Sequence, residues 1–246
     1  MEYLVIFLPL IGSVICYFGK NIGNFFSEIT SSLFVILSAI FSVIVFYKGF
    51  YHDIYGNYLI FNWINSGELN VNWSINIDPL SSVMIVVVTF VSALVHIYSI
   101  GYMSHDPHKP RFMSYLSLFT FSMLCLVVSD NFLQLFFGWE GVGLCSYLLI
   151  GFWYKKNSAN NAAIKAFIVN RVGDFGLAIG MFLIFFQFGT LNFSELFEMI
   201  SIYSEKNIKF IFGEFNLITT ICVFLFIGAM GKSAQFILHT WLPDAM

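Results

Sequence analysis

Four ionisable side chains stand inside stretches of sequence that are otherwise apolar. They are Glu140, Arg171, Asp174 and Lys232. A charge near the centre of a bilayer costs about 2.5–3.5 kcal/mol, so such residues usually face protein or water and pair with one another. A carboxylate and an amine that meet in a hydrated pocket can exchange a proton. This set of residue types therefore predicts proton transfer.

The alternative for each charge is a structural ion pair that holds helices together. Arg171 and Asp174 are three residues apart on one face of a predicted helix, and both interpretations stay open for them. Glu140 and Lys232 lie in separate apolar runs and have no such local partner. For these two residues we favour a functional role, in which each is the partner of the other.

A row of polar side chains follows Lys232. Gln235 and His239 recur after it at helical spacing, so one face of a helix over this region would line a file of water. Pro243 should then disturb the helix, and irregular backbone at membrane depth is tolerated mainly beside protein or a water-filled cavity. Broken helices are typical of transporters. For His239, a hydrogen bond in the core is the alternative to a role as proton relay.

The elements that position these residues are membrane helices. Of 246 residues, 59% are hydrophobic and 10% are charged, whereas a soluble domain has about 25% charged residues. The net charge of −3 offers no basic surface for nucleic acid. A helix needs roughly 20 apolar residues to cross the bilayer. We predict an all-α polytopic membrane protein with about seven transmembrane helices, at 3–19, 29–47, 80–102, 112–129, 132–154, 162–188 and 215–242.

A small hairpin outside the membrane is predicted between the second and third of these stretches. Its second strand shows apolar residues alternating with polar ones, the period of a strand, and residues 58–64 precede it across a turn at 65–67. The alternating apolar residues are Leu69, Val71, Trp73, Ile75 and Ile77.

Several residues that could suggest a bound cofactor have a simpler interpretation. The glycines of Gly141-Val142-Gly143 and the pair Gly176 and Gly180 lie inside apolar runs, which favours close helix packing. His105 and His108 have no third metal ligand nearby in the sequence. The cysteines stand singly and are predicted to be buried apolar residues, so no metal or iron–sulfur centre is expected; they are Cys16, Cys125, Cys145 and Cys222.

Four segments closely resemble one family of membrane subunits. They are residues 101–115, 130–153, 170–176 (NRVGDFG) and 231–246. The family is the antiporter-like membrane subunit of proton-pumping NADH:quinone oxidoreductase, respiratory complex I, called chain 5 in mitochondria and subunit L in bacteria. The likeness runs through nearly the whole chain in order, and the runs WEGVGLCSYLLIGF and GKSAQ are its most specific parts.

The resemblance implies a site and its roles. Members of this family contain two inverted repeats, each with a broken helix, and a Glu and a Lys in the first repeat move protons. The residues at the matching motif positions are Glu140 and Lys232. Further matches are Asp174 and Arg171, at positions near an adjacent subunit, and His239 and Trp241, on the broken helix beside the proton route.

The resemblance also implies a domain organisation and partners. Residues 1–110 would hold the N-terminal helices with the outer hairpin, and residues 111–246 the first antiporter-like proton-channel repeat. Family members are far longer, so we expect this chain to be the N-terminal part of a longer protein. No cofactor is expected on the chain, whereas NADH, FMN, iron–sulfur clusters and quinone are expected in partner subunits, both membrane and peripheral. The expected location is the bacterial cytoplasmic membrane or the mitochondrial inner membrane.

Two other functions stay open. A subunit of a multisubunit cation/proton antiporter would share the Glu and Lys pattern but would lack redox chemistry; the loop at 105–115 favours the complex I branch. In the second alternative, the chain is a purely structural membrane subunit whose internal charges serve only helix packing.

Overall fold

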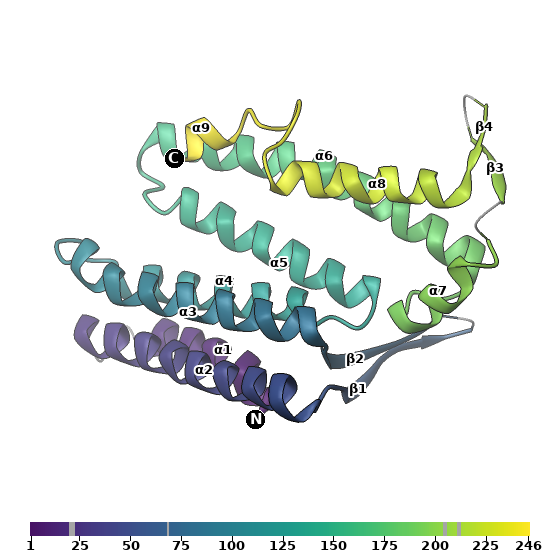
Figure 1. Cartoon of the computed structure of the whole chain (residues 1–246). Helices are drawn as coiled ribbons and strands as arrows, with labels where there is room; N and C mark the ends of the chain where they lie inside the picture. Colours follow the sequence, from purple (N-terminus) through teal and green to yellow (C-terminus); the bar gives the residue numbers. More distant parts are fainter. Residues whose placement is uncertain (20–22, 68, 204–205, 211–212) are drawn as a thin grey trace. The chain divides into compact units, whose positions relative to one another are not determined.

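A computed structural model describes residues 1–19, 23–67, 69–203, 206–210 and 213–246. These residues form two compact units (Figure 1): the first comprises Met1–Ile60, Ser74–Ser129 and Gln134–Phe152, and the second Phe61–Trp73, Asp130–Leu133 and Trp153–Met246. The elements in chain order are α1 (Glu2–Phe18), α2 (Asn24–His52), β1 (Gly56–Ser66), β2 (Leu69–Ile77), α3 (Pro79–Tyr102), α4 (Lys109–Val127), α5 (Phe132–Ile150), α6 (Asn157–Phe188), α7 (Phe193–Ile200), β3 (Asn207–Phe210), β4 (Gly213–Asn216), α8 (Leu217–Lys232) and α9 (Leu242–Ala245).

Long apolar helices dominate the described part of the chain. Within it, five helices are long and apolar enough to cross a membrane, namely α2, α3, α4, α5 and α6. Two further apolar helices are shorter: α1 has 17 residues and α8 has 16. A helix therefore occurs in each predicted stretch, and the helical membrane class is confirmed.

The interior of the first unit contains many hydroxyl side chains, and its surface is largely apolar. Most serine and threonine side chains on α2, α3 and α4 are buried, while Leu33, Ile40, Phe90 and Leu94 are each more than half exposed. This distribution is expected where helices face lipid and hold together through interhelical hydrogen bonds. The buried hydroxyl residues on these helices include Ser31, Ser38, Ser42, Thr89, Ser117 and Thr120.

The predicted hairpin is confirmed as a two-stranded sheet of β1 and β2. In β2 the apolar side chains of Val71, Ile75 and Ile77 are buried, whereas those of Asn70 and Asn72 are exposed. The alternation in the sequence therefore matches the two faces of the strand at these positions. Ser74 departs from the pattern, because it is buried where its backbone bonds the amide of Gln134.

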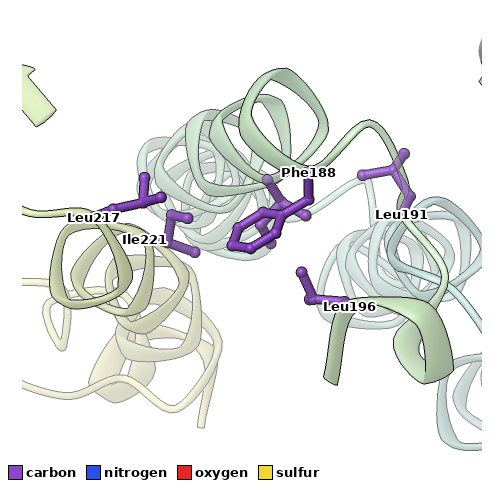
Figure 2. Close-up of a cluster of buried hydrophobic side chains, with 6 residues drawn as sticks. Phe188, Leu191, Leu196, Leu217 and Ile221 are labelled. Carbon is purple, nitrogen blue, oxygen red and sulfur yellow. The ribbon is translucent and has the colours of Figure 1, made fainter. Parts of the chain in front are cut away.

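In the second unit, α6, α7 and α8 meet at an apolar cluster (Figure 2). The ring of Phe188 lies at its centre, and each member is at most 9% exposed. Because α8 begins at this cluster, the cluster fixes where α8 lies along α6. The members are Ile184 and Phe188 on α6, Leu191, Leu196 on α7, and Leu217 and Ile221 on α8.

Candidate functional site

The second unit brings Asp174, Lys232 and Arg171 together. Asp174 Oδ1 lies 3.9 Å from Lys232 Nζ, and Asp174 Oδ2 lies 3.9 Å from Arg171 Nη1. The exposed fractions of these side chains are 5% for Asp174, 19% for Lys232 and 48% for Arg171. Both distances exceed the range of a direct hydrogen bond. One buried carboxylate on α6 therefore lies between a cation from its own helix and a cation from α8.

Adjacent glycines position this charge cluster. Gly173 and Gly231 immediately precede Asp174 and Lys232 in the sequence. A Cβ built on Gly173 would lie 3.1 Å from the Cα of Gly231, and one built on Gly231 would lie 3.2 Å from the Cα of Gly173. Since α6 and α8 touch through their backbones at this point, the next residue of each helix is held near the other.

The glycine contact continues along α6, as the small-residue pattern predicts. A Cβ on Gly176 would come within 2.6 Å of Ile227, and one on Gly180 within 2.8 Å of Leu225. Any larger residue at these positions would push the helices apart. The predicted close packing at Gly176 and Gly180 is confirmed.

Helix α8 ends at Lys232 because the backbone turns there. The Ala234 N–H donates to Gly231 O at 3.3 Å, and the Gln235 N–H donates to Met230 O at 3.0 Å. With Ala234 at a φ of 49°, these two bonds form a Schellman motif, which usually has glycine at the left-handed position.

This helix end overturns one sequence-based expectation. Gln235 and His239 lie beyond α8, so they do not share a helical face with Lys232. The helix also stops well before Pro243, which stands in the first turn of α9, where proline is tolerated. The physical reason is the left-handed alanine, which the sequence does not mark with a glycine or a proline.

We expect Ala234→Gly to stabilise the full-length protein by about 1 kcal/mol, because glycine adopts a positive φ without the Cβ clash. Ala234→Val should destabilise it, since a β-branched residue is a poor fit to this conformation. The measurement is the midpoint of thermal unfolding in detergent. A helix that continued through Ala234 would give the opposite order, with glycine as a destabilising substitution.

The chain then folds back along α8. Trp241 Nε1 donates to Gly231 O at 3.2 Å, which places the indole beside the helix end that carries Lys232. Lys165 Nζ pairs with Asp244 Oδ2 at 2.6 Å and ties α9 to α6. His239 is exposed. Of the two predicted supporting residues after α8, the structure places Trp241 at the charge cluster's helix end and leaves His239 on the surface of the unit.

Glu140 lies on α5, in the first unit, and is half-buried. The following residue packs tightly, because a Cβ on Gly141 would lie 2.8 Å from Ser122 Oγ on α4. The predicted close helix packing at Gly141 is thus confirmed. Lys232 belongs to the second unit, so the pairing of Glu140 with Lys232 stays a prediction.

Several buried polar residues escaped the sequence analysis, and Gln134 and His96 are two of them. Gln134 donates from Nε2 to Ser74 O at 2.7 Å and accepts from Ser74 N–H at 3.2 Å, so its amide binds β2 as a neighbouring strand would. His96 is fully buried on α3. The signal for both was present, since each is a strongly polar side chain inside an apolar run. Between residues 79 and 102, His96 is the only member of the set Asp, Glu, Lys, Arg and His.

Metal-binding groups are not found among the described residues, where no three His, Cys, Asp or Glu side chains come together. The thiols are free: Cys16, Cys125 and Cys145 are buried, as predicted. Cys222 is exposed on α8, so the prediction of burial is wrong for it. An exposed thiol on an apolar helix is consistent with a face that meets lipid.

Two protein families match the chain. The family described as "NADH:quinone oxidoreductase/Mrp antiporter, TM" matches residues 129–246. The family described as "NADH-Ubiquinone oxidoreductase (complex I), chain 5 N-terminus" matches residues 63–113.

Individual relatives are similar in sequence to this chain over its whole length. NADH-ubiquinone oxidoreductase chain 5 of Chondrus crispus is 51% identical over 247 residues, which cover 100% of this chain and 37% of the relative. NADH-quinone oxidoreductase subunit L of Rickettsia felis is 51% identical over 250 residues, covering 100% of this chain and 38% of the relative. The chain thus spans little more than a third of the length of these relatives.

Solved structures share the fold. The Mrp complex from Dietzia sp. DQ12-45-1b matches with a TM-score of 0.81 and 24% identity, over 99% of this chain and 25% of that chain. The membrane-bound sulfane sulfur reductase, an archaeal respiratory membrane complex, matches with a TM-score of 0.80 and 19% identity, over 99% of this chain and 47% of that chain. Combined with the family matches and the relatives, this shows that the chain is a multi-pass membrane protein and belongs to the family of antiporter-like membrane subunits that includes chain 5 and subunit L of NADH:quinone oxidoreductase.

Proposed function

We propose that the full-length protein is a proton-translocating membrane subunit of NADH:quinone oxidoreductase. NADH oxidation and quinone reduction take place in other subunits, and this subunit moves protons across the bacterial cytoplasmic membrane or the mitochondrial inner membrane. The observation that carries the proposal is the cluster of Asp174, Lys232 and Arg171 on two apolar helices. Charged groups at such positions mark ion and proton pathways in membrane proteins.

In this proposal Glu140 and Lys232 are the principal proton-transfer pair. Asp174 and Arg171 support them by holding Lys232 in an electrostatic field that another charge can change. Trp241 and His239 lie along the proton route after α8. The support for these roles is the carboxylate of Asp174, which lies 3.9 Å from a cation on each side, so a change at either cation alters the field at the other.

The energetics require more than one pair of charges. Opposing a membrane potential of about 150 mV needs about 3.5 kcal/mol for each elementary charge. Moving a carboxylate and an ammonium group from about 4 Å to about 8 Å apart, at an effective dielectric constant of about 20, changes their attraction by about 2 kcal/mol. A single pair therefore falls short. Asp174, which lies 3.9 Å from Lys232, and Arg171, which lies 3.9 Å from Asp174, are further charges that can supply the difference.

In this proposal seven helices span the membrane, namely α1 to α6 and α8. The seventh is the broken helix, which runs from α8 through residues 233–241 to α9. Residues 1–110 form the N-terminal helices with the extramembrane hairpin, and residues 111–246 form the first antiporter-like repeat. The chain acts enzymatically only as part of the assembly: it carries no redox centre, and NADH, FMN, iron–sulfur clusters and quinone bind to partner subunits.

A subunit of a multisubunit cation/proton antiporter is the second candidate, since the Mrp complex shares the fold with a TM-score of 0.81. The complex I relatives are the better match, at 51% identity against 24%. Neighbouring genes distinguish the two functions. Genes for NADH- and quinone-binding subunits support complex I, and a cluster of small antiporter subunits supports the alternative.

The test of the proposal is proton transfer by the assembled complex in proteoliposomes. In the full-length protein, Glu140→Gln and Lys232→Ala should each sharply reduce the number of protons moved for each NADH oxidised. Lys209→Ala is the matched control, because Lys209 is a cation of the same unit in an exposed ion pair with Glu214 and should leave pumping unchanged. Wild-type pumping by both test variants would refute the assignment.

A further inference from the structure

A further polar residue, Asn170, lies on the face of α6 that meets α8. Asn170 is 6% exposed and stands one helical turn before Asp174, which is also buried. The backbone carbonyl oxygen of Asn170 would lie 3.7 Å from a Cβ built on Gly231, the residue before Lys232. Asn170 therefore belongs to the same helix contact as the charge cluster.

The side-chain oxygen of Asn170 is a buried acceptor. Among the residues that the structure describes, no donor forms a hydrogen bond with Oδ1. Buried polar atoms in folded proteins are bonded in about 90% of cases or more, either to protein or to ordered water. An amide oxygen that is buried without a donor gives up the hydrogen bonds that it makes to water in the unfolded chain, which is unfavourable. We therefore expect a donor at Oδ1.

The spacing of the neighbouring charges leaves room for a small bridging molecule. Lys232 Nζ and Asp174 Oδ1 are 3.9 Å apart, which is too far for a direct hydrogen bond. A polar contact of this length is one that a water molecule can bridge. The ammonium group of Lys232 supplies donors, and the oxygens of Asp174 and Asn170 are acceptors on adjacent turns of α6.

The charges of the cluster select the kind of molecule that fits. Lys232 and Arg171 are two cations beside the single carboxylate of Asp174, so a further cation would be repelled. An anion would face the oxygens of Asp174 and Asn170. A neutral molecule that can both donate and accept suits all of these groups. Water does so, and buried water molecules make about three hydrogen bonds to groups that would otherwise be unsatisfied.

We propose that Asn170 positions Lys232 through one bound water molecule, here called the Asn170 water. The Asn170 water donates to Asn170 Oδ1 and to Asp174 Oδ1, and it accepts from the ammonium group of Lys232. Asn170 is a positioning residue, because it acts on Lys232 through the water. This inference rests on the proposed function in proton translocation and adds a residue to it: the water keeps the ammonium group solvated when its distance from Asp174 changes.

The direct test is a cryo-EM map of the complete assembled complex at a resolution that shows ordered water. We expect a peak of density within about 3.2 Å of both Asn170 Oδ1 and Lys232 Nζ. A map of this quality without the peak, or with Oδ1 bonded to a protein donor, overturns the inference.

The functional test measures protons moved for each NADH oxidised by the complete complex in proteoliposomes, normalised to the amount of assembled complex. Asn170→Leu keeps the branched shape of the side chain but removes the acceptor, whereas Asn170→Ser keeps an oxygen that can bind the water. Asn161→Leu is the matched control, because it makes the same change at an exposed position of α6.

We expect the leucine variant to pump less than the serine variant. A hydrogen bond changes an equilibrium by about twofold to tenfold, so Asn170→Leu should lower the ratio at least about twofold relative to Asn161→Leu. Asn170→Ser should recover most of this loss. A packing role predicts the opposite order, because leucine fills the space and serine leaves a gap. A serine variant that pumps less than the leucine variant would therefore overturn the inference.

Lys232→Ala separates this inference from the proposed function. If Lys232→Ala lowers pumping but Asn170→Leu pumps like Asn161→Leu, the role of Asn170 is refuted and the proposed function stands. If Lys232→Ala pumps normally, the proposed function fails, and the positioning role of Asn170 fails with it. If Asn170→Leu does not assemble, the density in the wild-type complex decides, because it requires no substitution.

Discussion

Replacing Gly231 with leucine should prevent the full-length protein from accumulating in the membrane. Even a single added carbon at this position would lie 3.2 Å from the Cα of Gly173, and the remaining atoms of leucine have no space between the two backbones. Overpacking a well-packed site costs about 1–3 kcal/mol, and here the obstacle is a backbone and cannot change its rotamer, so we expect at least about 3 kcal/mol. The measurements are the amount of protein in the membrane and the midpoint of thermal unfolding.

Gly101→Leu is the matched control for this substitution. Gly101 is also in a membrane helix, α3, but a Cβ built on it meets no atom within 4 Å. The control should accumulate like the wild type. If Gly231→Leu also accumulates and unfolds at the wild-type temperature, the close contact of α6 and α8 is not what positions Lys232.

The second large effect is expected from Asp174→Asn. The amide fits the space of the carboxylate but removes the negative charge that lies 3.9 Å from both Lys232 and Arg171. Removing one partner of a buried ion pair costs about 3–5 kcal/mol, and we expect about 3 kcal/mol here because Lys232 is 19% exposed. Both the unfolding temperature and NADH-driven proton transfer should fall.

A double variant separates stability from function at this position. Asp174→Asn combined with Lys232→Met removes both charges, so it should recover much of the stability lost in Asp174→Asn while proton transfer stays low. The exposed pair offers the control: Asp244→Asn breaks the contact with Lys165 and should cost less than about 1 kcal/mol. Normal pumping by Asp174→Asn would remove Asp174 from the supporting residues.

Much of the fold was predictable because lipid imposes a simple pattern. Continuous apolar runs of sufficient length predicted the positions of the helices, and strict alternation predicted β2. The spacing of Gly176 and Gly180 predicted a close helix contact, although the identity of the partner helix, α8, came only from the structure.

The end of α8 was not predictable in the same way. Helix ends are usually marked by glycine or proline, and here an alanine takes the left-handed position. The hydrogen bonds between hydroxyl groups inside the first unit could not be predicted either. A serine in an apolar run does not indicate which helix carries its hydrogen-bond partner. The partners of His96, Ser117 and Ser92, could not be predicted for this reason, although the histidine itself is a strongly polar residue inside an apolar run.

The candidate site was predictable only where its residues share a helix. The spacing of Arg171 and Asp174 indicated their contact, which the structure contains at 3.9 Å. The approach of Lys232 to Asp174 depends on the register of α8 along α6, which tertiary packing sets. The pairing of Glu140 with Lys232 joins the two units and stays a prediction.

The position of Lys232 as the last residue of α8 has an electrostatic consequence of its own. The peptide dipoles of a helix add up to about half a negative charge at its C-terminus, which stabilises a nearby cation by about 0.3–1 kcal/mol and by up to about 2 kcal/mol where the site is partly buried. Adding a turn to α8 beyond Ser233 would carry that negative end away from the ammonium group. Winding or unwinding a single turn of backbone would therefore change how strongly the cation is held, even with every charged side chain left in place.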